Sequence, residues 1–408
     1  MSLDTATITI DNSDEWTLLQ AEIVEAVSAS GYINAEVLST SDEITPESML
    51  GKDVLIKIPT TDTSKPWRQV KGIVWEWQSM GPFRKNDKRS VHRLIVLPPI
   101  CLLSLRRFNR AFNDLPATQV WKQLLNEWGE RVPYSDEGPM MSLENEPCAV
   151  PLITAQQSNQ TDLEFLTDLF QSHGVFWYND SDGEASQPML TLGTLSSAAK
   201  PWATDETLSF NPQLTPIAYG PNVIQWTQQA FNGPRIPVVH GMNPSFSREV
   251  QPQNVNAILQ NPSNTNFRGF DWFYRQNLAP KSGLELSDMQ SRTSRVIEQK
   301  LALDNLWGTG MATTTTLAPG RKVTIDKLPG NSPSDWFVVS TRTLISGPGI
   351  GEGTLADETQ LLTSLRAVPL QTPFRPPLNS DRLEPPEING SNLDPDLRVV
   401  MNVGESHG

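Results

Sequence analysis

Cysteine and histidine are scarce in this 408-residue chain, and their scarcity excludes several classes of site. The two cysteines, Cys101 and Cys148, cannot build a disulfide framework, and no CxxC spacing is present to hold zinc or carry redox chemistry. The four histidines are scattered without HExxH or any other metal-ligand spacing. We therefore expect no metal and no cofactor.

Long apolar runs and basic residues are also in short supply. No uninterrupted apolar segment is long enough to cross a bilayer, and the amino terminus, MSLDTATITIDNSDEW, lacks the basic and apolar regions of a signal peptide. The chain has 32 Lys and Arg against 46 Asp and Glu, and its formal net charge of -14 repels nucleic acid and anionic membrane. We expect a soluble globular protein that has no nucleic-acid partner.

The sequence motifs of common catalytic classes are missing as well. There is no GxSxG, no GxxxxGK[ST] and no GxGxxG after a strand. Two pairs of acids, Glu144 with Glu146 and Asp162 with Glu164, have the residue types of a glycosidase pair. A structural interpretation is simpler, because the first pair lies in a polar loop and the second in a predicted first helical turn, where negative charge is favoured. We expect no catalytic residues and no enzyme activity.

Short runs of β-branched and aromatic residues, bounded by turn formers, dominate both ends of the chain. VLIKIP, QVKGIVWEW and VHRLIVLPP predict a first antiparallel barrel in residues 1–100, completed by residues 221–250. The pattern returns later in the same order: GRKVTIDKLP echoes GKDVLIKIP, WFVVSTRTLI echoes VKGIVWEW, and LLTSLRAVPL echoes HRLIVLPP. Three ordered echoes favour a second, related barrel at 306–371. The alternative is that two unrelated barrels share a strand–turn–strand cadence.

Between the two β regions the apolar spacing becomes helical. ATQVWKQLLNEWG carries one apolar stripe and stops at Gly129, which predicts a first helix. A second helix begins at a capping box of Thr161 and Glu164 and runs to the helix-ending Gly174, and a hairpin follows. His173 precedes Gly174, and its imidazolium would meet the helix dipole favourably there. We expect residues 101–220 to form an α/β insert with two helices and a hairpin. Residues 251–305 complete the insert, with a long helix at 287–305.

The composition changes once more from Thr372 onward. TPFRPPLNSDRLEPPEINGSNLDPD carries six prolines without apolar periodicity, which indicates an extended linker. LRVVMNVGESHG follows and is about one strand long. We expect residues 372–408 to be a Pro-rich linker and the first strand of a domain that the chain does not include.

One basic cluster opposes the overall charge. Its core lies in a predicted hairpin loop and includes Arg84, Lys85, Lys88 and Arg89, with Asp87 as its one acid. Further basic residues follow at Arg93, Arg106, Arg107 and Arg110. Base-stacking aromatics are not interleaved with the cluster, which disfavours a nucleic-acid face. Docking onto an acidic protein surface and a merely solvated loop both remain open, with Arg84, Lys85, Lys88 and Arg89 as the candidate docking residues.

Several segments together resemble one protein family. HRLIVLPPICLLSLRRFNRAFNDLPATQVWKQLLNEWG, QQSNQTDLEFLTDLFQSHGVFWYND and DWFYRQNL are similar, in this order, to segments of VgrG, the spike protein of type VI secretion systems. EQKLALDNLWGTG, LAPGRKVTI and TPFRPP continue the same succession. DWFYRQNL looks like the family's DYPG-type aromatic run but lacks its Pro–Gly. The resemblance spans nearly the whole chain, and the ordered succession carries it rather than any single motif.

The resemblance implies an α+β fold: two related antiparallel β-barrel domains with an inserted α/β region, assembled as a homotrimeric hub. Three chains would then present six barrels, so the hub adapts a hexameric tube to a trimeric spike in a contractile injection machine. The related baseplate hub of contractile phage tails or phage-like particles is the alternative. VVMNVGESHG would begin the family's OB-fold, which one strand cannot build.

The partners implied by the family are other components of the machine. They are a second and third copy of the chain, a hexameric Hcp-like tube protein, a PAAR-like spike-tip protein reached through the absent C-terminal spike, baseplate proteins and effectors. Membrane would be met only by puncture. The implied location is the bacterial cytoplasm during assembly, followed by secretion without a signal peptide.

Overall fold

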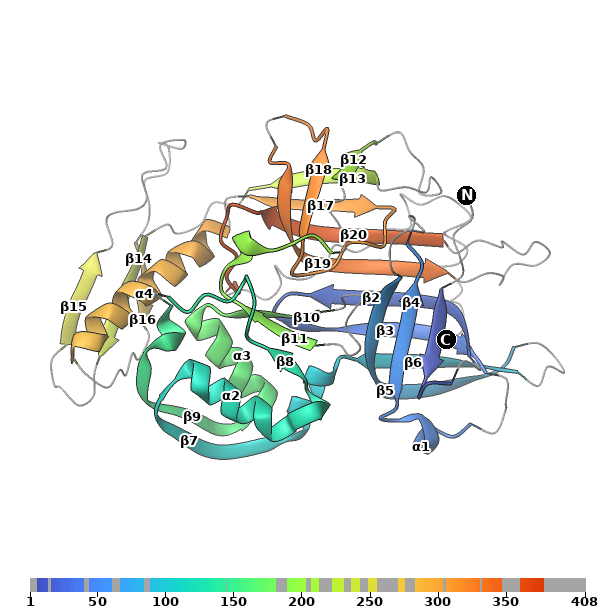
Figure 1. Cartoon of the computed structure of the whole chain (residues 1–408), viewed down its shortest axis with the longest axis horizontal. Helices are drawn as coiled ribbons and strands as arrows, with labels where there is room; N and C mark the ends of the chain where they lie inside the picture. The colour runs from blue at the N-terminus through green and yellow to red at the C-terminus, as the bar shows by residue number, and fades with distance from the viewer. Residues whose placement is uncertain are drawn as a thin grey trace.

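The protein contains two adjoining β-barrels, an α/β insert that lies between them in sequence, and a small sheet with a long helix (Figure 1). A computed structural model describes residues 6–13, 16–39, 44–60, 67–83, 89–144, 146–180, 189–202, 207–212, 222–230, 236–242, 249–254, 271–275, 283–303, 306–330, 332–346 and 360–377. Most of these residues form strands, and four α-helices are found among them. No described helix combines the length and the apolar character needed to span a membrane.

The first barrel is a curled sheet of six antiparallel strands in the order β1-β4-β5-β6-β3-β2. Alternate residues point inward, so Ile23, Ile56 and Val96 are fully buried in its core. A one-turn helix, α1 (Pro46–Met49), lies between β3 and β4. The strands are β1 (Thr7–Ile10), β2 (Thr17–Ala26), β3 (Ala29–Leu38), β4 (Asp53–Ile58), β5 (Arg68–Pro82) and β6 (Ser90–Leu97).

The second barrel is closed, because β19 pairs with both β18 and β20 in the order β19-β18-β12-β13-β17-β20. Its core contains the rings of Trp226 and Trp336, which meet edge to face with centroids 4.9 Å apart. The strands are β12 (Thr207–Phe210), β13 (Asn222–Gln229), β17 (Trp307–Ala312), β18 (Lys322–Asp326), β19 (Asp335–Ser346) and β20 (Gln360–Pro369).

The two barrels are related in strand order and in residue register. In chain order, β2, β3, β4, β5 and β6 correspond to β13, β17, β18, β19 and β20, and equivalent neighbours pair antiparallel in both barrels. Two bulges recur at equivalent places: one follows Val74 in β5 and Val338 in β19, and the other follows Leu18 in β2 and Val223 in β13. The two barrels are thus related in strand order, register and bulge position, as the sequence echoes predict.

A matched glycine turn strengthens this relation. Gly51 and Gly320, which the sequence echo places in equivalent positions, have φ of 81° and 78°, a conformation that glycine adopts most readily. Each donates its N–H to the valine before the first bulge, Gly51 to Val74 O and Gly320 to Val338 O, both at 2.9 Å. The sixth strand breaks the pattern, since β1 is antiparallel to β4 whereas β12 is parallel to both β18 and β13.

The α/β insert lies between β6 and β12, and its core also includes Met289 and Ile297 of the long helix. Two long strands, β7 and β9, pair as a ribbon, and the helices α2 and α3 pack on it. Trp121 of α2 and Phe170 of α3 are in contact, with ring centroids 5.5 Å apart. Figure 1 shows this insert beside the first barrel. Its elements are η1 (Pro99–Leu105), β7 (Arg107–Pro116), α2 (Ala117–Trp128), η2 (Gly129–Arg131), β8 (Tyr134–Ser135), η3 (Pro147–Ala149), β9 (Pro151–Thr161), α3 (Asp162–His173), β10 (Phe176–Asp180), β11 (Met189–Gly193) and η4 (Ser196–Ala198).

Helix ends in the insert agree with the sequence signals. The first helix ends at Gly129, as predicted. In α3, Thr161 Oγ1 accepts from the Glu164 N–H at 3.1 Å and Glu164 Oε2 accepts from the Thr161 N–H at 2.7 Å, which is the predicted capping box. The predicted hairpin pairs β10 with β11 antiparallel. The long helix is α4 (Gly283–Ala302), a few residues earlier than 287–305.

The expectation that residues 221–250 complete the first barrel is wrong. The first of its strands, β13, lies in the second barrel between β12 and β17, and β14 (Ile236–Met242) pairs with β15 (Glu249–Asn254) and β16 (Asp271–Arg275) in a separate sheet beside α4. Alternation in the sequence identified strands here but could not identify their partners, because every strand offers the same backbone hydrogen-bonding groups. Residues 306–371 consequently supply four of the second barrel's six strands.

Candidate assembly interface

A continuous sheet joins the two barrels. β2 of the first barrel pairs antiparallel with the second half of β19, from Ala26 opposite Ser340 to Gln20 opposite Ser346. The Val27 N–H also donates to Val339 O at 2.8 Å. Because backbone hydrogen bonds cross the junction, the barrels are fixed relative to one another through one sheet rather than through a flexible linker.

Ion pairs reinforce this junction on the β2 side. Arg342 Nε lies 2.8 Å from Glu22 Oε1, and both side chains are partly buried. The buried Arg68 guanidinium of β5 pairs with Glu25, which ties the opposite wall of the first barrel to the same strand. Opposite charges on facing strands therefore favour the observed register of β2 on β19.

Arg89 is the one candidate docking residue of the predicted basic loop that the structure describes. Arg84, Lys85 and Lys88 lie outside the described residues. Arg89 stands at the base of the hairpin, where its carbonyl accepts from the Phe83 N–H at 2.9 Å and its exposed guanidinium lies 5.4 Å from the Phe83 ring centroid. The hairpin itself, between β5 and β6, is present as predicted.

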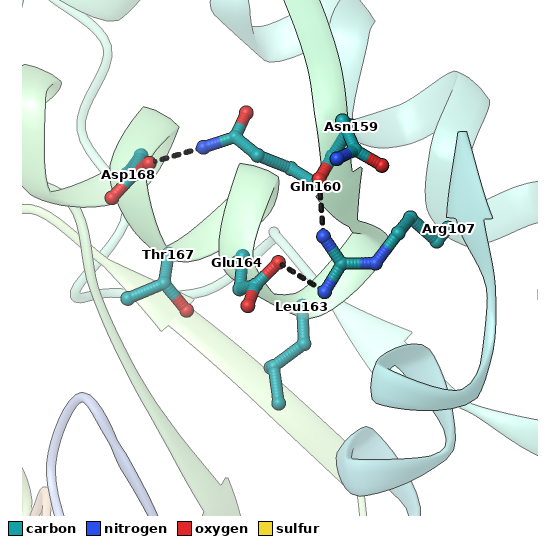
Figure 2. Close-up of a pocket in the computed structure, with 7 residues that line it drawn as sticks. All are labelled: Arg107, Asn159, Gln160, Leu163, Glu164, Thr167 and Asp168. Atoms are coloured by element: carbon teal, nitrogen blue, oxygen red, sulfur yellow. Dashed lines mark hydrogen bonds and ion pairs between the residues drawn. The ribbon is translucent and has the colours of Figure 1, made fainter. Parts of the chain in front are cut away.

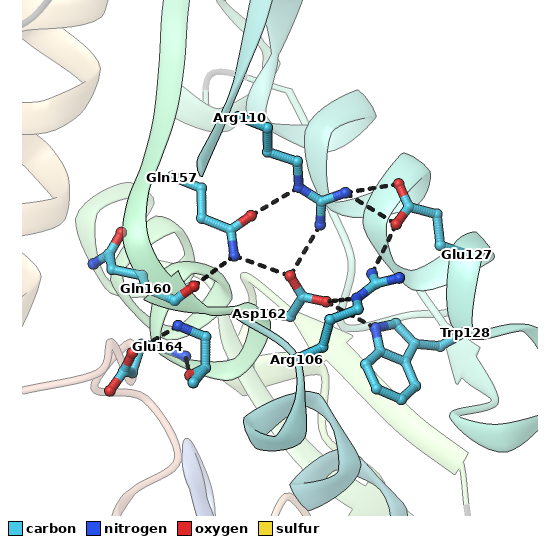
Figure 3. Close-up of polar contacts among 9 residues, drawn as sticks. Arg106, Arg110, Glu127, Trp128, Gln157, Gln160, Asp162 and Glu164 are labelled. Carbon is cyan, nitrogen blue, oxygen red and sulfur yellow. Dashed lines mark hydrogen bonds and ion pairs between the residues drawn. The ribbon is translucent and has the colours of Figure 1, made fainter. Parts of the chain in front are cut away.

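Other members of the basic cluster belong to an internal polar network (Figure 3). Asp162, fully buried at the start of α3, accepts from Arg106 Nε at 2.6 Å and Trp128 Nε1 at 3.0 Å through Oδ2. Its Oδ1 accepts from Arg110 Nη2 and Gln157 Nε2, both at 2.9 Å. This carboxylate connects β7, β9, α2 and α3, so Arg106 and Arg110 hold the insert together and are not candidates for a docking surface.

The second arginine pairing in this network is closer to solvent. Glu127 of α2 accepts from Arg106 Nη2 at 2.7 Å and from Arg110 Nη1 at 2.9 Å, as Figure 3 shows. The Glu127 side chain is 40% exposed, whereas that of Asp162 is 0% exposed. The two acids thus share the same arginines in very different environments.

A shallow depression beside α3 contains Glu164 and Asp168 (Figure 2). Glu164 is engaged in the capping box and lies 3.6 Å from Arg107 Nη2, and the hydrogen bond from the Thr161 N–H lowers the pKa of Glu164. Asp168 Oδ2 accepts from Gln160 Nε2 at 2.7 Å. The carboxylates of Glu164 and Asp168 are thus both bound by neighbouring groups. Together with the buried network of Asp162, this agrees with the structural interpretation of the Asp162 and Glu164 pair.

The two acids of the other pair, Glu144 and Glu146, also lie in different environments. Glu144 is exposed, whereas Glu146 is buried and accepts from Arg375 Nη2 at 2.8 Å. Arg375 lies in the segment predicted to be a linker, yet its guanidinium is buried and also donates to Gly174 O at 2.9 Å, and neighbouring Phe374 is fully buried. The start of the predicted linker, residues 372–377, is therefore packed against the insert; residues 378–408 lie outside the described part.

His173 has a structural role, but in a different charge state from the one predicted. Burial lowers its pKa to about 4, so the ring is neutral near pH 7 and does not meet the helix dipole as a cation. The neutral ring places Nδ1 2.9 Å from Leu169 O. Nearby, Lys300 Nζ donates to Gln171 O at 2.5 Å, and burial lowers the pKa of Lys300 to about 8. Among the described residues, no cluster of three or more His, Cys, Asp or Glu side chains suits a metal ion.

The structure thus has tandem related barrels that one sheet joins, with an α/β insert between them in sequence. A family model for the phage tail baseplate hub (GPD) matches residues 24–348, and the chain belongs to this family. The resemblance to spike and hub proteins is thereby confirmed at the family level, and the family is one of structural proteins. No curated protein sequence matches the chain.

Solved structures of both kinds of machine share the fold. The E. coli c3393 protein, described as a type VI secretion component similar to the T4 bacteriophage tail proteins gp27 and gp5, has a TM-score of 0.59 at 13% identity, covering 91% of this chain and 80% of its own. The 43 kDa tail protein of prophage MuSo2 from Shewanella oneidensis has a TM-score of 0.56 at 11% identity, covering 90% and 99%. A chain of the Francisella PdpA-VgrG complex has a TM-score of 0.54 at 9% identity; the match covers 94% of this chain and 54% of that one.

Proposed function

We propose that this protein is the trimeric hub of a contractile injection machine, where it adapts a hexameric tube to a threefold spike. The register-matched pair of barrels carries the proposal. Three chains with two equivalent barrels each supply six equivalent units, which is the number a sixfold tube end requires. The rigid sheet between the barrels supports this role, because a ring needs its units at a fixed angle.

The setting that we favour is the spike of a type VI secretion system, in which the hub also helps to deliver effectors. Similarity to the c3393 protein and to the PdpA-VgrG complex supports this setting. The baseplate hub of a contractile phage tail or phage-like particle is the second candidate, which the matched family model and the MuSo2 tail protein favour. Genes beside this one that encode either a type VI sheath and ATPase or a virion would separate the two.

The partners in this proposal follow from the two ends of the hub. One face of the ring would meet a hexameric tube protein of the Hcp type, and the other would continue into a spike that carries a PAAR-like tip protein. Baseplate proteins and effectors would bind around it. Assembly would take place in the bacterial cytoplasm, before secretion without a signal peptide and puncture of a membrane.

The oligomeric state and ring shape test the proposal. Sedimentation of the purified chain at increasing concentration should show a trimer, and electron micrographs of that trimer should show six similar lobes around a channel. Addition of the hexameric tube protein should give a capped-tube complex. A monodisperse monomer at the highest soluble concentration, or a trimer without six lobes, would refute the adaptor role.

The basic hairpin loop offers a more local test of docking. Changing Arg84, Lys85, Lys88 and Arg89 to Glu should weaken binding to an acidic tube or baseplate partner while leaving the melting temperature of the barrel unchanged. The variant Lys200→Glu, at an exposed lysine of the insert, controls for charge in general. If tube binding by the loop variant equals that of the wild type, the loop is not part of the docking surface.

A further inference from the structure

The junction between the barrels uses the second half of one β19 edge and most of one β2 edge. One edge of β19 pairs with β18 from Asp335 to Phe337, and from Ser340 onward β2 pairs with β19. The opposite edge of β19 pairs with β20 throughout. β19 therefore extends beyond its pairing with β18 and forms backbone hydrogen bonds with β2 of the other barrel.

Because the two barrels are related, each strand of the junction has a counterpart in the other barrel: β5 corresponds to β19, and β13 corresponds to β2. β5, the counterpart of β19, pairs with β4 as far as Ile73, and Val74 still exchanges backbone hydrogen bonds with Gly51 and Lys52. From Trp75 to Pro82, β6 is the one described strand that pairs with β5. β13, the counterpart of β2, pairs with β12 only at Asn222 and Val223. Within the described part of the chain, no strand pairs with the remaining edge of β5 or with that of β13.

Burial distinguishes the used edges from the open ones. Ser340, Thr341 and Thr343 of β19 are 0% exposed, whereas Gln78 and Ser79 in the matching half of β5 are exposed. On the other side of the junction, Ile23 and Val24 of β2 are buried, and their counterparts Gln228 and Gln229 of β13 are exposed. The exposed side chains of the open edges are mostly polar, and the exposed apolar side chain of Met80 in β5 is an exception. Such edges suit a surface that is solvated before assembly and paired afterwards.

We propose that β13 of one chain pairs antiparallel with the second half of β5 of the next chain, repeating the β2–β19 junction between copies. This inference rests on the proposed trimer and specifies how the trimer closes. The contact is heterologous, since one chain offers β13 and its neighbour offers β5, and three such contacts alternate with the three internal junctions to close a ring of six barrels.

The matched registers fix which residues meet. Arg342 lies opposite Val24 in the internal junction, and the β5–β19 and β2–β13 alignments convert this pair into Gln78 opposite Gln229 of the neighbouring copy. The hydrogen bond from the Val27 N–H to Val339 O makes Arg342 and Val24 a non-hydrogen-bonded pair, because the two pair types alternate along antiparallel strands. Side chains are closest at such pairs, at a separation suitable for a disulfide.

Cysteine cross-linking tests this register in the full chain. The native Cys101 and Cys148 are buried, so a double variant with Gln78→Cys and Gln229→Cys adds two accessible thiols. Mild oxidation should convert most of the double variant into covalent trimers on a non-reducing gel. Each single variant alone should stay uncross-linked, and a mixture of the two single variants should give covalent dimers.

An off-register pair provides the matched control. Gln78→Cys with Gln225→Cys shifts one thiol by four residues, about 13 Å along the strand, and should cross-link at least about tenfold less because a disulfide cannot span that gap. A trimer by sedimentation that cross-links equally in both registers, or in neither, overturns the strand pairing and leaves the hub proposal intact. A chain that never forms a trimer overturns both.

Discussion

Asp162→Asn should destabilise the α/β insert by about 3 kcal/mol, because four donors converge on the two buried carboxylate oxygens. The amide has one oxygen and one NH2 group, so the NH2 group must face two donors that lose their acceptor. Each buried donor left unpaired costs about 1–3 kcal/mol, and more when it is charged. Arg106 and Arg110 keep Glu127 and are partly exposed, which limits the loss to the lower part of the range for a broken buried pair.

Glu127→Gln is the matched control, because it removes the other acid that the same two arginines share. Its side chain is 40% exposed, so the expected cost is below about 1 kcal/mol. Guanidinium titration followed by tryptophan fluorescence would report the insert, which contains Trp121, Trp128 and Trp177. An Asp162→Asn variant within about 1 kcal/mol of wild type, or equal effects of the two variants, would refute the view that burial makes Asp162 the centre of the network.

Two further predictions concern the ends of α3. Thr161→Ala should lower the free energy of unfolding by about 1 kcal/mol because the Glu164 N–H loses its cap, while Thr167→Ala on the same helix should change it little; thermal melts of both variants would show the difference. At the other end, His173 has a folded pKa of about 4 against 6.5 in the unfolded chain, so acid favours unfolding. The stability that its neutral form contributes is present above pH 6.5 and should fall by up to about 3 kcal/mol towards pH 4. Denaturant titrations across this range should give a shallower slope for His173→Gln, and parallel slopes would contradict the assignment.

Helices in this protein could be predicted from sequence because their signals are local. The apolar stripe that begins at Val120, the stop at Gly129 and the capping box at Thr161 lie within a few residues of the structure that they specify. The three strand echoes were also sufficient to find the duplication, since β4, β5 and β6 align with β18, β19 and β20 in the predicted order. The helix signals and the strand echoes can both be read from the sequence because each depends on residues that are close together in the chain.

Contacts that are distant in sequence were the ones that sequence reasoning missed. Arg106 and Arg110 were grouped with the basic loop because they are close along the chain, yet their partner Asp162 is 56 and 52 residues away. Phe374 and Arg375 were assigned to a linker because proline dominates their surroundings, although Phe374 alone signalled burial. The neighbours of β13 in the sheet, β12 and β17, likewise could not be predicted, because the residues of β13 alone do not indicate with which strands it pairs.

The direction of β12 limits the equivalence of the two barrels. Five strands of the first barrel have antiparallel counterparts in the second, but β12 runs parallel to both of its neighbours, opposite to the relation of β1 with β4. Point substitutions cannot reverse a strand, since a reversal requires the chain to enter the sheet from its other end. β12 therefore closes the second barrel without repeating the path of β1, so five of the six strands are equivalent in the two barrels and the sixth is supplied by the segment that follows the α/β insert.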